Sequence, residues 1–291
     1  MSAESGVPES GDLPRGILRG IAQVYLQDNV VTGLLFLVGL LVAGPVVGLA
    51  ALLGSAVGLA TALSVRAPVE RVARGFYGFN STLVAVGAVV SFRPLWLALV
   101  AAVVAAAVAA LLTRVADFFL RVPPYTAPFV FTYWPLLHLG VFGDWSSAPS
   151  FGGPLDLDAD VWGVFGSEAA VFLVSGLLPG LFILAGLAAS RWRLVGGALA
   201  ASVVGLLVVE LVPLFPADEI ATGAYGFNAA LVAVGMLSTG RGWRSCLLAV
   251  PAALLIQAAV EAVGLVPATF PFVLVMWTAD LWRARGAKDA A

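Results

Sequence analysis

The stretch Gly75-Phe-Tyr-Gly-Phe-Asn-Ser-Thr-Leu-Val-Ala-Val-Gly87 recurs as Gly223-Ala-Tyr-Gly-Phe-Asn-Ala-Ala-Leu-Val-Ala-Val-Gly235, with ten of thirteen positions identical. A second pair, Thr126-Ala-Pro-Phe-Val130 and Thr269-Phe-Pro-Phe-Val273, is repeated at nearly the same offset. A weaker similarity links Val24-Tyr-Leu26 with Val171-Phe-Leu173. Motifs that recur at a nearly constant offset predict that the chain is an internal duplication.

The composition indicates the environment of the chain. Of the 291 residues, 61% are hydrophobic and 11% are charged, and the mean hydropathy is +1.02. A soluble domain carries about 25% charged residues and cannot cover so much apolar surface. The sequence therefore predicts an all-α polytopic membrane protein, and it disfavours a soluble enzyme, a nucleic-acid-binding protein and a disulfide scaffold. Cys246 is the single cysteine, and no cysteine–histidine cluster suggests a metal site or a bound cofactor.

Apolar stretches separated by proline, glycine and arginine clusters predict ten transmembrane helices of about 20 residues each. The expected spans are 17–44 with a break around Asp28 to Gly33, 46–65, 75–92, 94–116, 126–142, 165–187, 193–212, 222–238, 243–262 and 269–284. They divide into a first repeat at 17–142 and a second repeat at 165–284, joined by an extracellular loop at 143–164. Residues 1–16 and 285–291 are expected to be tails, and the first tail lacks the pattern of a cleaved signal peptide.

The basic residues orient these spans. With the N-terminus in the cytoplasm, 14 of the 15 lysines and arginines fall on the cytoplasmic side, and only Arg93 falls outside. The loop 143–164 carries four aspartates and no basic residue, as an external loop would. We therefore expect a multi-pass protein of the cell membrane with both termini in the cytoplasm.

Five spans in each half imply an inversion. An odd number of crossings reverses the direction of the second half, so the two repeats are expected to be inverted about an axis in the membrane plane. Inverted repeats are typical of transporters and channels, whose solute site lies near the midplane where the halves meet.

The repeated prolines indicate where a pore would form. Val122-Pro-Pro-Tyr-Thr-Ala-Pro-Phe129 and Val266-Pro-Ala-Thr-Phe-Pro-Phe272 interrupt the helical hydrogen-bond ladder and leave carbonyl oxygens unpaired. Such backbone is tolerated at membrane depth only inside protein or along a wet cavity. We expect two re-entrant half-helices that face a shared pore, with Thr126 and Thr269 adding hydroxyl groups near its middle. Free acceptors of this kind suit a neutral solute that is rich in N–H donors.

Other polar side chains in the apolar spans are candidates for solute contact or for support of the broken helices. Gln23 and Glu168 lie near the start of the first span of each half and are expected to face a vestibule. Asn80 and Asn228, in the repeated Tyr-Gly-Phe-Asn motif, need hydrogen-bond partners, and capping of a broken helix explains them at least as well as solute contact.

With these residues in view, the chain resembles the urea transporter family over about 17–284. The resemblance rests on Gln23-Val-Tyr-Leu-Gln-Asp-Asn29, on the two Tyr-Gly-Phe-Asn motifs and on the two Thr-x-Pro-Phe motifs. It implies a channel-like homotrimer in the lipid bilayer, with one pore per subunit that passes urea down its gradient. Each pore would have outer and inner sites, separated by a constricted middle that acts as a selectivity filter.

The resemblance also implies roles for particular residues. An aromatic slot would accept the planar solute, two leucines would narrow the passage, two threonines would line the middle, and polar residues would serve the two sites. By motif, these positions are Gln23, Leu26, Phe79, Leu83, Thr126, Glu168, Ala169, Phe227, Leu231 and Thr269. Leu26 departs from the family pattern, because an aromatic residue is expected there.

Two other functions remain open from the sequence. One is a channel for another small neutral solute, such as ammonia, a short amide or water. The other is a proton-coupled transporter that uses Glu168 or Glu261. A membrane enzyme is disfavoured because no paired carboxylates or metal ligands occur at a suitable spacing.

Overall fold

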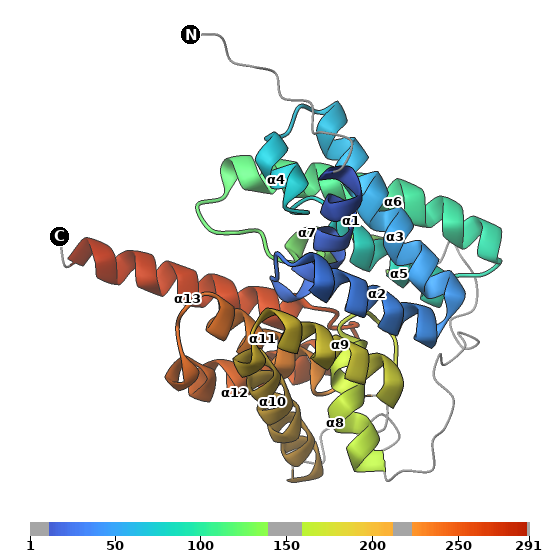
Figure 1. Cartoon of the computed structure of the whole chain (residues 1–291). Helices are drawn as coiled ribbons and strands as arrows, with labels where there is room; N and C mark the ends of the chain where they lie inside the picture. The colour runs from blue at the N-terminus through green and yellow to red at the C-terminus, as the bar shows by residue number, and fades with distance from the viewer. Residues whose placement is uncertain (1–11, 139–158, 212–222, 290–291) are drawn as a thin grey trace.

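A computed structural model describes residues 12–138, 159–211 and 223–289. The regular secondary structure in these ranges is helical, which confirms the predicted all-α class. Figure 1 shows the helices of the first half, in blue to green, beside those of the second half, in yellow to red. Most of the expected N-terminal tail and of the expected loop 143–164 lies outside the described residues.

The described helices divide between the two halves of the chain. The first half consists of α1 (Asp12–Ala22), the short 3₁₀ helix η1 (Gln23–Tyr25), α2 (Val30–Ala43), α3 (Pro45–Ser64), α4 (Val69–Ala73), α5 (Phe79–Ser91), α6 (Leu95–Phe119) and α7 (Ala127–His138). The second half consists of α8 (Ala159–Ala170), α9 (Leu177–Ser190), α10 (Trp192–Leu211), α11 (Phe227–Ser238), α12 (Trp243–Ala262) and α13 (Phe270–Asp289).

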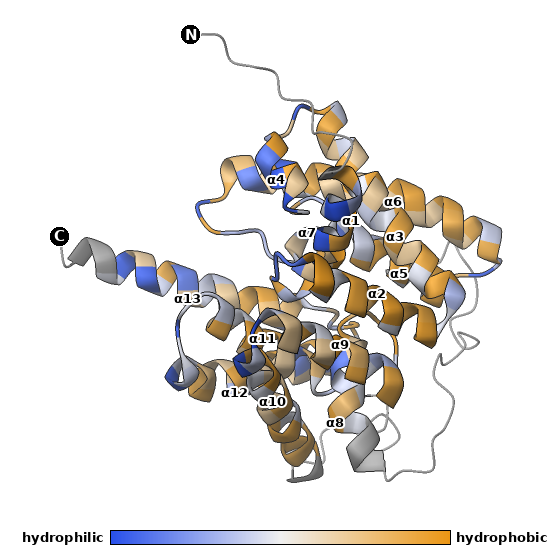
Figure 2. Cartoon of the chain, viewed as in Figure 1, coloured by the Kyte–Doolittle hydropathy of each residue, from blue (hydrophilic) through white to orange (hydrophobic). Residues whose placement is uncertain are grey.

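The apolar helices differ in length. Within the described residues, four helices (α3, α6, α10 and α12) are long and apolar enough to cross a membrane, and the bent pair formed by Leu13–Tyr25 and α2 would make a fifth. Figure 2 shows α3 and α6 as mainly hydrophobic, in orange. The apolar helices α5, α9 and α11 have 12 to 14 residues, about 20 Å at 1.5 Å per residue, against a hydrocarbon core of about 30 Å. The count of ten spans therefore stays a prediction.

The predicted break in the first span is present but lies at residues 26–29, slightly before the expected Asp28 to Gly33, since α2 begins at Val30. The chain turns by 78° between Leu13–Tyr25 and α2. Leu26 takes the left-handed conformation, with a φ of 58°. Asn29 then caps α2, because its Oδ1 accepts from the backbone N–H groups of Val31 at 2.8 Å and Thr32 at 3.3 Å.

The second half breaks at the corresponding place. The expected span 165–187 is not one continuous helix, since α8 ends at Ala170 and α9 begins at Leu177. Leu173 repeats the left-handed backbone of Leu26, with a φ of 61°, and Gly176 has a φ of 120°. The end of α8 and the start of α9 thus correspond to η1 and α2 at an offset of 147 residues, the register of the weak sequence similarity.

Two pairs of glycines repeat the same close packing. A methyl group on Gly33 would lie 1.9 Å from the carbonyl oxygen of Leu18, and one on Gly180 would lie 2.0 Å from that of Phe165. Gly75 and Gly223 both have a positive φ, of 76° and 73°. The duplication is therefore visible in the backbone as well as in the sequence.

Helices α2 and α9 join the two halves. The Thr32 hydroxyl on α2 donates to the carbonyl oxygen of Gly186 on α9 at 2.8 Å. The ring of Phe36 lies against Gly186, so a methyl group added to Gly186 would lie 2.5 Å from a ring carbon of Phe36. Thr32 and Phe36 thus pack α2 of the first half directly against α9 of the second.

Candidate functional site

Thr126 and Thr269 meet at the boundary between the two halves. Each is about 1% exposed, and Thr269 Oγ1 donates to Thr126 Oγ1 at 2.7 Å. They directly precede α7 and α13 in the region of the repeated prolines. The preceding residues, Tyr125 and Ala268, have positive φ values of 46° and 44°. The chain therefore changes direction in the same way before each threonine.

Asn80 and Asn228 hold these two turns. Asn80 Nδ2 donates to the carbonyl oxygen of Tyr125 at 3.1 Å, and its Oδ1 accepts from the N–H of Phe129 at 3.0 Å. Asn228 makes the same pair of contacts with Ala268, at 3.0 Å, and with Phe272, at 3.4 Å. Both side chains are fully buried. Each amide thus pairs a free carbonyl and a free N–H of a broken helix, as the capping interpretation predicts.

The apolar candidates begin the two short helices next to these turns. Phe79 and Phe227 are the first residues of α5 and α11, and Leu83 and Leu231 follow one turn later. All four are buried in one apolar cluster that also contains Ala169. The ring of Phe79 packs edge-on against that of Phe76, with ring centroids 6.0 Å apart.

Gln23 and Leu26 lie at the bend of the first half and are half-buried. Gln23 Nε2 donates to the carbonyl oxygen of Arg74 at 3.2 Å. The Arg74 side chain forms an ion pair with Asp28 at 2.6 Å, and Arg19 approaches the same carboxylate at 3.4 Å. The bend and the turn before α5 are therefore joined by one polar cluster.

Glu168 lies in α8 and is fully buried. Its Oε2 accepts from the Tyr25 hydroxyl at 3.0 Å, and its Oε1 accepts from the Ser202 hydroxyl at 3.0 Å. The Tyr25 hydroxyl oxygen is also 2.9 Å from the backbone carbonyl oxygen of Glu168. In the 147-residue register the counterpart of Gln23 is Ala170, two residues beyond Glu168. Gln23 and Glu168 thus do not occupy equivalent backbone positions.

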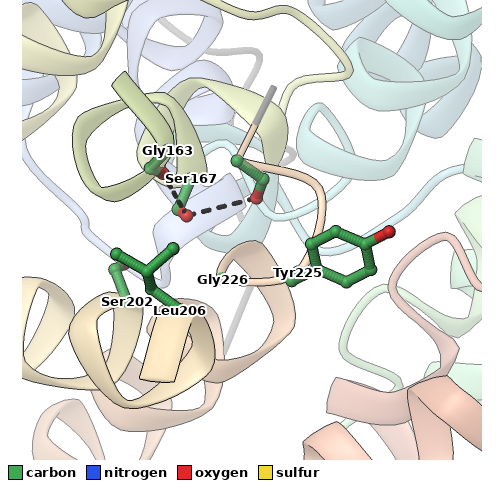
Figure 3. A pocket seen from close by; sticks show the side chains of 7 residues that line it. Gly163, Ser167, Ser202, Leu206, Tyr225 and Gly226 are labelled. Carbon is green, nitrogen blue, oxygen red and sulfur yellow. Dashed lines mark hydrogen bonds between the residues drawn. The ribbon is translucent and has the colours of Figure 1, made fainter. Parts of the chain in front are cut away.

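Ser167, the residue before Glu168, lies beside a small cavity in the second half. Figure 3 shows that the Ser167 hydroxyl points at two carbonyl oxygens, those of Gly163 at 2.7 Å and Gly223 at 3.1 Å. The cavity beside it, lined also by Ser202 and Tyr225, has a volume of about 10 Å³. This is room for about one water molecule, so the cavity cannot hold a larger solute.

Sequence analysis missed several polar residues that support the candidate site. Gln27 is buried, donates to the carbonyl of Tyr25 at 2.7 Å and to Ser238 at 3.0 Å, and accepts from Ser190 at 2.6 Å. Gln27 lies in the quoted motif, but its side-chain partners Ser190 and Ser238 are distant in the sequence. The Tyr125 hydroxyl donates to Asp280 at 2.7 Å.

Ionisable groups in the interior are few. Within the described ranges, no cluster of three or more histidine, cysteine, aspartate or glutamate residues is arranged to hold a metal ion. The arrangement instead offers hydroxyl groups, amides and backbone carbonyls between apolar walls. Such groups can exchange hydrogen bonds with a neutral solute.

Comparison with known proteins agrees with this chemistry. The family model for urea transporters matches residues 15–283. Urea transporter 1 of Rattus norvegicus is 38% identical over 72 residues, which is 25% of this chain and 19% of that protein. Urea transporter 1 of Mus musculus is 43% identical over 70 residues, which is 24% of this chain and 18% of that protein. The aligned segment thus spans about a fifth of each relative. Since the family model matches nearly the whole chain, this protein belongs to the urea transporter family.

Proposed function

We propose that this protein is a channel-like passive transporter of urea. Its membership of the urea transporter family supports the substrate class. The observation that carries the proposal is the contact between Thr126 and Thr269, buried where two broken helices from different halves meet. A neutral solute needs no coupling ion to cross there.

Two reciprocal contacts support the inverted arrangement of five-span halves. The Trp134 indole N–H donates to the carbonyl oxygen of Val266 at 2.8 Å, and the Trp277 indole N–H donates to that of Pro123 at 2.9 Å. Each half thus closes on the proline turn of the other, as a two-fold axis between them requires. We propose that this axis lies in the membrane plane, with both termini in the cytoplasm and α7 and α13 entering from opposite sides.

In the proposed path, urea passes from a polar entrance to the threonine pair. Gln23 and Leu26 border the first site, and Phe79 and Phe227 flank the flat faces of the solute. Leu83 and Leu231 narrow the passage on either side of the threonines. Glu168 and Ala169 border the second site, where Tyr25 and Ser202 hold the Glu168 carboxylate by hydrogen bonds.

The threonine pair suits the hydrogen-bonding chemistry of urea. A hydroxyl group can donate once and accept twice. Urea carries four N–H donors and one carbonyl acceptor, so it can replace the Thr126–Thr269 bond by one contact to each hydroxyl. The exchange keeps the hydrogen bonds paired while water is excluded, which lowers the cost of desolvating a polar molecule. We further propose that three such subunits associate in the cell membrane.

The proposal is tested by uptake of urea into proteoliposomes. We expect uptake faster than in empty vesicles, and the same rate with and without proton or sodium gradients. Uptake that requires a proton gradient would favour the coupled transporter, and no uptake would reject urea. Parallel measurements with ammonia, acetamide and water distinguish urea from the other neutral solutes.

A further inference from the structure

A groove on the second half has no role in the proposed solute path. It lies between α12 and α13, is also lined by Met236 near the end of α11, and has a volume of about 860 Å³. Figure 1 shows α13 extending past α12 and away from the body of the molecule. One end of the groove lies between the start of α12 and the last third of α13, where Ser245 and Arg283 line it. We call this end the mouth of the groove.

Most of the residues that line the groove are apolar. On α12, the lining residues Ser245, Ala249, Ala252 and Ile256 recur at intervals of three or four, so they share one face of the helix. Ser245 and Ile256 are separated by about 16 Å at 1.5 Å per residue. The two alanines leave space that larger side chains would fill. This shape fits an extended hydrocarbon chain along the helix.

Two of the apolar side chains that line the groove are largely exposed. Leu248 on α12 is 81% exposed and Trp282 on α13 is 79% exposed. Trp282 lies next to Arg283 at the mouth, and tryptophan is enriched where the apolar region of a membrane meets the headgroups. Exposed apolar side chains with a tryptophan beside an arginine are typical of a surface that faces lipid near the headgroups.

The mouth carries positive charge. Arg241 and Arg283 line it, and the exposed Arg244 and Arg285 lie at the same ends of α12 and α13. Arg241 forms an ion pair with Asp280 and is largely buried. Arg283, Arg244 and Arg285 are exposed. Their guanidinium groups are suited to bind a phosphate, and the Ser245 hydroxyl lies on the same lining.

From this combination we infer that the groove between α12 and α13 binds one anionic phospholipid from the bilayer. Arg283 holds its phosphate at the mouth, and one acyl chain lies along Ala249, Ala252 and Ile256. A free phosphate would leave the apolar part of the groove empty. A zwitterionic lipid would not use the surplus positive charge. By the positive-inside orientation, this lipid comes from the cytoplasmic leaflet. The inference does not depend on which solute the protein carries.

The test measures lipid binding to the purified full chain. In detergent, added phosphatidylglycerol should raise the thermal unfolding temperature and remain bound in native mass spectrometry, whereas phosphatidylcholine should do neither. Arg283→Gln should weaken retention of phosphatidylglycerol by about fivefold, the effect expected for one basic residue at a membrane surface. Arg121→Gln, which removes an exposed arginine from the first half, should leave retention unchanged.

A second variant tests the apolar part of the groove independently. Ala252→Phe should abolish retention by filling the space for the acyl chain, and Arg283→Gln remains the decisive variant if Ala252→Phe does not fold. Equal binding of both lipids, or unchanged retention in Arg283→Gln, would overturn the inference. So would the same stabilisation by inorganic phosphate alone, which would indicate a simple anion site. Cross-linking of Ala252→Cys to another subunit would instead make the groove an interface between copies of the chain.

Discussion

The hydroxyl group of Tyr25 lies 3.0 Å from Oε2 of Glu168, although the two residues are 143 positions apart. Tyr25 belongs to η1 of the first half and Glu168 to α8 of the second, and both are fully buried. A buried carboxylate is costly unless donors surround it. Tyr25 and Ser202 supply those donors, so this contact ties the bend of one half to the interior of the other.

Replacement of Tyr25 by phenylalanine should destabilise the protein. Tyr25→Phe removes one of the two side-chain donors to a buried carboxylate, and we expect a loss of about 1–3 kcal/mol in the free energy of unfolding. Thermal unfolding in detergent measures the effect. Tyr133→Phe is the matched control, since Tyr133 is also buried but bonds a neutral partner, Ser91, at 2.6 Å. A loss in Tyr25→Phe no larger than that in the control would contradict this view of Glu168.

The threonine pair should matter for flux more than for folding. Thr126→Val and Thr269→Val each remove a hydroxyl from the proposed path, and we expect urea flux to fall about two- to tenfold, as for the loss of one hydrogen bond. Serine at either position should restore most of the flux because it keeps the hydroxyl.

The control for this pair is Thr132→Val on α7. Thr132 is a buried threonine that bonds within its own helix, to the carbonyl of Pro128 at 2.7 Å. Its replacement should leave flux nearly unchanged. If both threonine variants carry urea at the wild-type rate, the pair has no part in conduction.

Asn80 should not tolerate aspartate. Asn80 Nδ2 donates to the Tyr125 carbonyl, and in Asn80→Asp a carboxylate oxygen would face that carbonyl without a proton to share. We expect a loss of about 1–3 kcal/mol in the free energy of unfolding, with a lower unfolding temperature as the readout.

Asn29→Asp is the matched control for this substitution. Asn29 caps α2 with its Oδ1 as an acceptor, and aspartate caps a helix about as well as asparagine. We expect Asn29→Asp to unfold near the wild-type temperature. Equal destabilisation of the two variants would show that the amide donor of Asn80 is unimportant.

The paired glycines should be intolerant of any side chain. Gly33→Ala and Gly180→Ala place a methyl group about 2 Å from a backbone carbonyl oxygen, which no side-chain movement relieves. We expect little folded protein from either variant, measured as the monodisperse fraction in size-exclusion chromatography. Gly286→Ala on α13 meets nothing within 4 Å and should be neutral or slightly stabilising. Normal yields of both interior variants would mean that the helices can separate at these points.

Local patterns in the sequence were sufficient for much of this protein. The apolar composition determined the membrane class, because a soluble protein of this size cannot bury so many apolar side chains away from water. The repeated motifs determined the duplication, and the prolines before α7 and α13 marked where the helices break, because proline removes a backbone donor wherever it occurs. The broken first span was likewise predictable from its polar residues.

Only the tertiary structure decided which distant groups meet. The break between α8 and α9 was not predicted, because it falls among mainly apolar residues, where Leu173 and Gly176 both have a positive φ. The partners of Glu168 come from η1 and α10, and those of Gln27 from α9 and α11. Backbone geometry gave weight to the 147-residue register, which the weak sequence similarity alone could not, and this register pairs Gln23 with Ala170. Hydrogen bonds between residues more than a hundred positions apart depend on how the two halves pack, so one-dimensional patterns determine the elements and packing determines the contacts.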